Sequence, residues 1–93
     1  MSVMHFEWDA KKEKANAAAH GVDFTEAREA FLAARRVMAT DEAHSATELR
    51  LFCIGKTARG ILTVRFTVRG ESIRIIGAGY WRKGGKIYEK KQG

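Results

Sequence analysis

Residues 63–79, TVRFTVRGESIRIIGAG, decide the fold, because two runs of alternating polar and apolar residues flank the dipeptide Gly70-Glu71. Alternation with a period of two is typical of β-strands, and a turn-like dipeptide between two such runs predicts an antiparallel hairpin. A two-residue turn also fixes the register, so that Arg69 is expected opposite Ser72. The stretch therefore predicts the centre of a sheet.

The same period of two continues upstream of this hairpin, whereas the N-terminal third of the chain follows a helical period. The predicted strands are Arg36 to Thr40, Glu48 to Lys56, Ile61 to Arg69 and Ser72 to Ala78. The predicted helices are Ala10 to His20, between a capping Asp9 and Gly21, and Phe24 to Ala33, which opens with Asp23 and Glu26. The alternating segment His5 to Trp8 is a further candidate strand.

These elements predict an α+β fold in a single domain, residues 1–93. Two N-terminal helices form one layer on an antiparallel sheet of four strands, or of five if the first segment joins it. Phe24, Ala27 and Phe31 recur at helical spacing and are expected to face the core. The basic C-terminal segment is expected to be loose.

Composition limits the classes of function. Lysine and arginine total 17 against 11 acidic residues, a net charge of +6 that attracts polyanions such as nucleic acid or an acidic protein. The single cysteine, Cys53, cannot form an internal disulfide and is expected to be an inert, buried thiol in a reducing compartment. Because no apolar run reaches the ~20 residues of a membrane span and Met1 to Asp9 lacks a signal-peptide core, we expect a cytoplasmic protein.

Three arginines fall on the polar face of the hairpin. Counting outward from the turn places Thr67 opposite Arg74, with Arg65 and Arg69 on either side of Thr67. Like charges at this distance repel one another, and a nucleic-acid phosphate would relieve the repulsion. A cationic surface for nucleic acid is one interpretation, and a solvated sheet face is the other. The alternate positions are expected to pack beneath, against the helices: Val64, Phe66, Val68, Ile73 and Ile75.

The first helix carries a polar stripe, because Lys12, Asn16 and His20 follow one another at intervals of four residues. His20 lies at the predicted C-terminus, where the helix dipole favours a protonated imidazole that suits an acid or a phosphate clamp. A histidine that binds loose helix carbonyls is the alternative. His5, near the terminus, and His44, in a polar loop, are expected to be solvated surface residues.

Residues 77–86, GAGYWRKGGK, combine Tyr80 and Trp81 with three cations on a glycine-rich backbone. Aromatic rings that stack on unpaired bases, beside cations that hold phosphates, are typical of single-stranded RNA sites. The alternative is that Trp81 closes the edge of the core and the tail is a solvated basic arm. No histidine, cysteine and carboxylate set has the spacing of metal ligands, and no nucleotide-binding glycine motif is present, so neither metal nor cofactor is predicted.

Several segments occur together and in order: FEWD, the spaced Lys12 and Asn16, HGVDF with TEA after it, TVRG and SIRIIGAG. The combined spacing W-D-x-x-K-x-x-x-N-x-x-x-H-G-V-x-F is considerably more specific than any of its parts. On these residues the chain resembles the BrnT family of bacterial toxins, over roughly Phe6 to Glu89.

This resemblance implies a RelE-like fold and a metal-independent ribonuclease that stops growth until an antitoxin binds it. It further implies a BrnA-type antitoxin, which is a ribbon-helix-helix protein, in a heterotetrameric complex. That complex represses its own operon, with the operator DNA contacted by the antitoxin.

By the same resemblance, the Lys-x-x-x-Asn and His-Gly positions are Lys12, Asn16, His20 and Gly21. The family's arginines after the third strand correspond to Arg69 and Arg74.

The chain departs from the family pattern at two places. Ala19 stands where a basic residue often precedes the His-Gly pair. The S-A-R-x-A-type arginine after the last strand is absent from residues 77–82, GAGYWR, where Arg82 is the candidate replacement.

We hypothesise transesterification, in which the ribose 2′-OH attacks the adjacent phosphate and the protein supplies proton transfer, charge stabilisation and positioning. The catalytic candidates are His20 for proton transfer and Arg69, Arg74 and Arg82 for the transition-state charge. The RNA-binding candidates are Lys12, Asn16, Arg65, Tyr80, Trp81 and Lys83. The alternatives are a non-catalytic nucleic-acid-binding module and a module that docks an acidic partner or the antitoxin.

Overall fold

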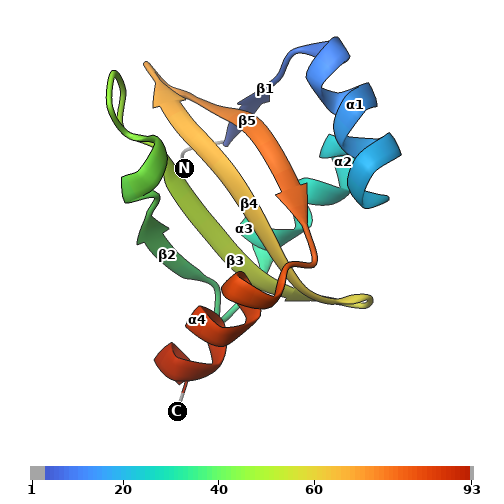
Figure 1. Cartoon of the computed structure of the whole chain (residues 1–93), viewed down its shortest axis with the longest axis vertical. Coiled ribbons are helices and arrows are strands. Elements are labelled where there is room, and N and C mark those ends of the chain that lie inside the picture. The colour runs from blue at the N-terminus through green and yellow to red at the C-terminus, as the bar shows by residue number, and fades with distance from the viewer. Residues whose placement is uncertain (1–3, 93) are drawn as a thin grey trace.

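The computed structural model describes residues 4–92, which form one five-stranded sheet with helices on both faces (Figure 1). The two ends of the predicted 1–93 domain, including the start of the Met1–Asp9 segment, lie outside the described residues. The strands are β1 (His5–Glu7), β2 (Val37–Thr40), β3 (Leu51–Thr57), β4 (Gly60–Arg69) and β5 (Ser72–Gly79). The helices are α1 (Ala10–His20), α2 (Phe24–Ala27), α3 (Glu29–Leu32) and α4 (Arg82–Gln92), with a short 3₁₀-helix, η1, at Glu42–His44. The predicted α+β class is confirmed.

The sheet order is β1-β5-β4-β3-β2, and β2 to β5 form the antiparallel meander that the turns predict. The expected fifth strand is present as β1, but it pairs with β5 in parallel, with Phe6 opposite Ile73. The prediction of a wholly antiparallel sheet is therefore wrong, and the sheet is mixed. Alternation identifies a strand without giving its direction, and here α1 to α3 carry the chain from β1 to β2 at the opposite edge.

The β4–β5 hairpin has the register that its turn predicts. The structure contains all four predicted pairs: Arg69 with Ser72, Val68 with Ile73, Thr67 with Arg74 and Phe66 with Ile75. A β-bulge follows, because Arg65 lies opposite Gly77 and leaves Ile76 as an extra residue of β5. Since β4 itself remains regular, Arg65 stays on the same face as Arg69.

The core lies between α2, α3 and one face of the sheet, which we call the inner face. Phe31 meets Phe66 and Phe6 edge to face, with ring centroids 5.0 and 5.3 Å apart. Cys53 is buried there as predicted, and burial raises the pKa of its thiol to about 12. The prediction that Val68 packs in this core is wrong: it is 56% exposed, because the end of β4 runs past the covering helices (Figure 1).

The predicted helix from Phe24 to Ala33 is two short helices, α2 and α3, separated at Arg28. The amide of Phe31 bonds to the carbonyl of Arg28, three residues back, which tightens the chain at the junction. The carbonyl of Ala30 also lies so close to Gly55 that a Cβ there would sit 2.6 Å from it. The helical layer therefore approaches β3 through a glycine, which a hydrophobic pattern does not reveal.

The third strand begins later than predicted, at Leu51 instead of Glu48. The amide of Arg50 donates to the hydroxyl of Ser45, 3.0 Å away, and so closes a loop where a strand was expected. The remaining strand ends agree with prediction or differ by one residue, which is ordinary for element boundaries.

Helix α1 has the predicted bounds, with Asp9 as N-cap and Gly21 in the left-handed conformation at its end. No residue of α1 is buried, so polar contacts attach it to the rest of the fold. The amide nitrogen of Asn16 donates to the carbonyls of Val22 and Ala78 at 2.9 and 2.8 Å, and its oxygen accepts from the amide of Ala78 at 3.1 Å. The hydrogen bonds of Asn16 therefore attach α1 to β5.

The expectation of a loose C-terminal segment is wrong, since the segment forms α4 on the face of the sheet opposite α2 and α3 (Figure 1). We call this the outer face. Gly84 lies directly over Thr63, which lets the helix axis approach β4 closely. The glycine pair suggested flexibility, but Gly84 instead permits contact between a helix and a sheet.

We predict that Asn16→Ala destabilises the domain, because the amide and carbonyl of Ala78 lose their partners. The expected cost is about 2 kcal/mol, which lowers the Tm of a domain of this size by roughly 10 °C. Lys12→Ala, one turn earlier on the exposed surface of α1, is the matched control and should leave Tm unchanged. Equal Tm values for both variants in thermal unfolding followed by circular dichroism would show that Asn16 does not hold α1 in place.

Candidate functional site

The arginines of the central hairpin lie on the outer face, and each has a carboxylate partner from another part of the chain. The pairs are Arg65 with Asp41 at 3.1 Å, Arg69 with Glu48 at 3.7 Å and Arg74 with Glu7 at 2.7 Å. These carboxylates offset the repulsion among the arginines, so the clustering alone does not require a phosphate. The prediction that repulsion among these arginines calls for a phosphate is therefore wrong.

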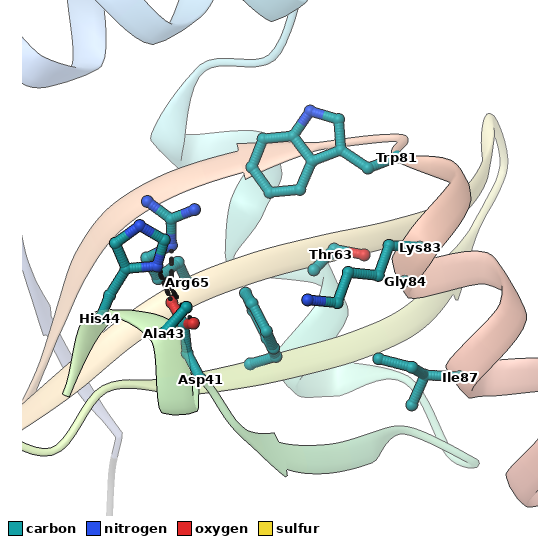
Figure 2. Close-up of a pocket in the computed structure, with 10 residues that line it drawn as sticks. Asp41, Ala43, His44, Thr63, Arg65, Trp81, Lys83, Gly84 and Ile87 are labelled. Atoms are coloured by element: carbon teal, nitrogen blue, oxygen red, sulfur yellow. Dashed lines mark hydrogen bonds and ion pairs between the residues drawn. The ribbon is translucent and has the colours of Figure 1, made fainter.

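The three pairs differ in how much of each guanidinium is available. Arg74 is half-buried and hydrogen-bonded to Glu7. Arg69 has 54% of its side chain exposed and holds its partner loosely. Arg65 contacts Asp41 through Nε, without the alignment of a hydrogen bond, and Figure 2 shows its terminal nitrogens directed away from that carboxylate. Arg65 and Arg69 can therefore meet an anion without losing a strong contact.

Asp41 is the carboxylate at the centre of the outer-face contacts, and it is only 2% exposed. Besides Arg65, it holds His44, whose Nδ1 lies 3.1 and 3.0 Å from the two carboxylate oxygens. A carboxylate removed from water needs such charged and hydrogen-bonded partners. His44, 49% exposed, is thus not the freely solvated residue that its polar loop suggested.

A groove on the outer face runs between α4 and η1, with a volume of about 220 Å³ (Figure 2). Cationic and aromatic side chains gather around an apolar floor. The ammonium of Lys83 lies 6.0 Å from the ring centroid of Phe52. The lining residues that carry charge or an aromatic ring are Asp41, His44, Phe52, Arg65, Trp81 and Lys83.

Trp81 joins this groove to the end of α1. Its indole covers Gly79 so closely that no side chain fits there. The Nε1–H of Trp81 points at Nδ1 of His20, 3.4 Å away, and the two rings meet edge to face with centroids 5.2 Å apart. His20 therefore contacts Trp81, which lines the groove, but is not itself among the lining residues.

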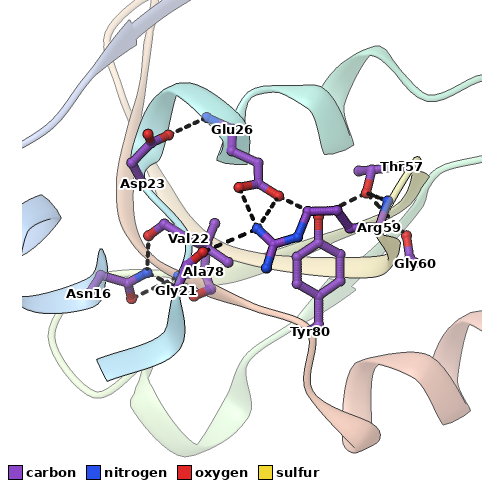
Figure 3. Close-up of polar contacts among 10 residues, drawn as sticks. All are labelled: Asn16, Gly21, Val22, Asp23, Glu26, Thr57, Arg59, Gly60, Ala78 and Tyr80. Carbon is purple, nitrogen blue, oxygen red and sulfur yellow. Dashed lines mark hydrogen bonds and ion pairs between the residues drawn. The ribbon is translucent and has the colours of Figure 1, made fainter. Parts of the chain in front are cut away.

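Tyr80 is not placed to stack on RNA. Its hydroxyl donates to Glu26 at 2.6 Å and lies 2.8 Å from the hydroxyl of Thr57, while Arg59 covers its ring with the guanidinium carbon 4.9 Å from the centroid (Figure 3). Burial and the bond to Glu26 raise the pKa of Tyr80. Tyr80 thus belongs to a polar network that joins α2, β5 and the turn before β4.

The other RNA-binding candidates are divided by the structure. Lys12 is exposed on α1, and Lys83 lines the groove from the first turn of α4. Asn16 uses its amide on backbone groups, as Figure 3 shows, which leaves it little capacity to bind RNA. Arg82 is exposed at the start of α4, adjacent to Trp81 in the chain.

Sequence reasoning missed the pairing of Asp41 with His44. The two residues are three apart, in the segment DEAH, and η1 brings residues at that spacing onto one side of a helical turn. This spacing could have suggested the contact, but the fact that the side chain of Asp41 turns inward toward Arg65 could not be inferred. Among residues 4–92, no three His, Cys, Asp or Glu side chains gather as ligands for one metal ion.

A family model described as "Ribonuclease toxin, BrnT, of type II toxin-antitoxin system" matches residues 8–84. The chain that forms this groove therefore has the sequence pattern of a family of toxins that act on RNA and have an antitoxin partner. The chain belongs to the BrnT family. No curated protein matches the chain closely enough to count as a relative. None of the described helices is long and apolar enough to cross a membrane.

We predict opposite effects for two neighbouring glycines of α4. A methyl group at Gly84 collides with Thr63, whereas one at Gly85 meets nothing within 4 Å. Gly84→Ala should therefore destabilise the domain by about 1 to 3 kcal/mol, and Gly85→Ala should stabilise it by up to about 1 kcal/mol. Urea unfolding measures both effects, and identical midpoints for the two variants would mean that α4 does not pack on the sheet as described.

Proposed function

We propose that this chain is an endoribonuclease that cleaves RNA without a metal ion, by attack of the ribose 2′-OH on the adjacent phosphate. The single observation that carries the proposal is the groove in which Arg65, Lys83 and Trp81 converge beside a histidine. The family match supports the same reading, since it describes a ribonuclease toxin. Such a reaction needs no protein nucleophile, only positioning, charge stabilisation and proton transfer.

In this proposal, RNA lies across the outer face of the sheet. Trp81 offers an aromatic ring on which a base can stack, and the ammonium of Lys83 attracts the RNA phosphates. Arg65 and Arg69 stabilise the charge that builds on the phosphate, because their guanidinium groups remain accessible. Arg74 acts in the same way only if its bond to Glu7 opens, so its contribution is smaller.

The roles of two further residues follow from their positions next to Trp81. Arg82, exposed beside Trp81, takes the place of the arginine that relatives carry after the last strand. His20 transfers a proton, since Trp81 engages its Nδ1 and leaves Nε2 for the RNA. Lys12, further along α1, contributes long-range attraction.

The RelE-like relationship, the cytoplasmic location and the antitoxin form part of the same proposal, supported by the family match and the earlier resemblance. The antitoxin is of the BrnA type, a ribbon-helix-helix protein, in a heterotetramer whose operator contacts come from the antitoxin.

A second function is favoured by a specific observation: Glu7, Asp41 and Glu48 stand on the same face as the arginines. Carboxylates in these positions repel an RNA backbone and suit a face that docks a protein with both charge signs. A module that binds the antitoxin or nucleic acid without cleaving RNA is therefore the alternative.

We predict that the purified protein cleaves RNA in EDTA and leaves 2′,3′-cyclic phosphate and 5′-hydroxyl ends. Arg69→Ala should slow cleavage by about 10-fold or more, since one charge-stabilising donor is lost, and should lower the salt dependence of RNA binding by about one ion. Arg28→Ala removes the same charge from an exposed position between α2 and α3, outside the groove, and is the matched control. Gel analysis of end-labelled RNA measures both.

Two results would contradict the proposal. RNA binding without cleavage under any condition would favour the non-catalytic module. Cleavage that stops in EDTA and returns with a divalent ion would refute the metal-independent mechanism.

A further inference from the structure

We propose that His44, oriented by Asp41, is the general base that takes the proton from the 2′-OH of RNA bound in the groove. This inference rests on the proposed function and adds a catalytic residue to it. The sequence predicted a solvated surface residue at His44, so the assignment comes from the geometry alone.

The imidazole of His44 is oriented by Asp41. Nδ1 of His44 lies within hydrogen-bond distance of both oxygens of Asp41, and a carboxylate in that position accepts the Nδ1–H. The neutral ring then carries its free lone pair on Nε2, which is the arrangement that a general base needs. Figure 2 shows the second ring nitrogen on the side of the imidazole away from Asp41. No residue among 4–92 hydrogen-bonds to that nitrogen.

Asp41 itself is held rigidly. Its amide donates to the carbonyl of Arg50 at 2.8 Å, its carbonyl accepts from the hydroxyl of Ser45 at 2.7 Å, and its carboxylate contacts Arg65. With a side chain that is almost completely buried, the carboxylate has little freedom to turn away. Asp41 is therefore a positioning residue for His44, held by Ser45 and Arg50 of its own loop and by Arg65 of β4.

The imidazole of His44 lies among groups that suit RNA. His44, Arg65, Lys83 and Trp81 line the same groove, so a proton acceptor, two cations that can bind phosphate and an aromatic ring share one space. His20 contacts Trp81 but does not line the groove. The proton acceptor therefore lies beside the groups that would bind the scissile phosphate.

Nε2 of His44 takes the 2′-OH proton as the O2′–P bond forms, and the P–O5′ bond breaks. The leaving O5′ receives a proton from water. The products are a 2′,3′-cyclic phosphate and a 5′-hydroxyl, and His44 then returns its proton to solvent. No metal, cofactor or oxidant enters the step.

A structural role for His44 predicts something different. The ring is half exposed but Asp41 is buried, so removing the imidazole takes one partner from a buried carboxylate and should lower the unfolding midpoint. Arg65 stays as the other partner of Asp41. A structural role would therefore change stability alone, whereas a catalytic role lowers turnover in protein that is still folded at the assay temperature.

The test uses the three histidines of the chain as one another's controls. Wild type, His44→Gln, His20→Gln and His5→Gln are compared for kcat on a short RNA, for Kd on the same RNA with 2′-O-methyl groups, and for unfolding midpoint. His5 lies exposed on β1 at the edge of the sheet, outside the groove. His44→Gln should lower kcat by about 100-fold or more with Kd unchanged and the protein still folded at the assay temperature, whereas His5→Gln should match wild type. Added imidazole should restore part of the activity of His44→Gly.

Each other outcome overturns the inference. If His44→Gln cleaves like wild type while Arg69→Ala is impaired, the dyad is not catalytic and the proposed ribonuclease stands. If kcat and RNA affinity fall together and imidazole restores nothing, His44 only binds. If wild type cleaves no RNA, the proposed function and the dyad fail together.

Discussion

The buried carboxylate of Asp41 is the constraint on which the outer face depends. A charge with 2% exposure must be compensated, and Arg65 and His44 provide that compensation from β4 and η1. Because Arg65 is fixed by the hairpin register, the loop that carries Asp41 and His44 must close over the sheet beside it. The same contact thus sets the position of the loop, the direction of one guanidinium and the orientation of one imidazole.

The hydrophobic core and the attachment of α1 use different chemistry. Aromatic packing of Phe31 and Phe66 holds the inner face, as hydrophobic periodicity predicts. The attachment of α1 is instead polar. Glu13 accepts from the indole of Trp8 at 3.1 Å and from the amide of Phe24 at 3.0 Å. Asn16 adds its hydrogen bonds to β5. Many of the residues on which the family resemblance rests, Trp8, Asn16 and Phe24 among them, therefore build the scaffold.

The sequence predicted those features that depend on local spacing. Helix α1, the hairpin register and the shared face of Arg65, Arg69 and Arg74 all follow from periods and turns. The parallel pairing of β1 and the docking of α4 could not be predicted, because they depend on which distant surface a segment meets. For the same reason Asn16 and Tyr80 looked available to RNA, although backbone and carboxylate partners already occupy their polar groups.

The central claim is that RNA binds in the outer-face groove beside Asp41, and the two tryptophans offer a direct test. Trp81 lines the groove, whereas Trp8 packs against the inner-face core and donates to Glu13. In a ¹⁵N–¹H NMR titration with 2′-O-methyl RNA, the account predicts that the indole N–H signal of Trp81 moves while that of Trp8 stays in place. A shift of the Trp8 signal with an unmoved Trp81 signal would contradict the account, because it would place RNA on the inner face of the sheet.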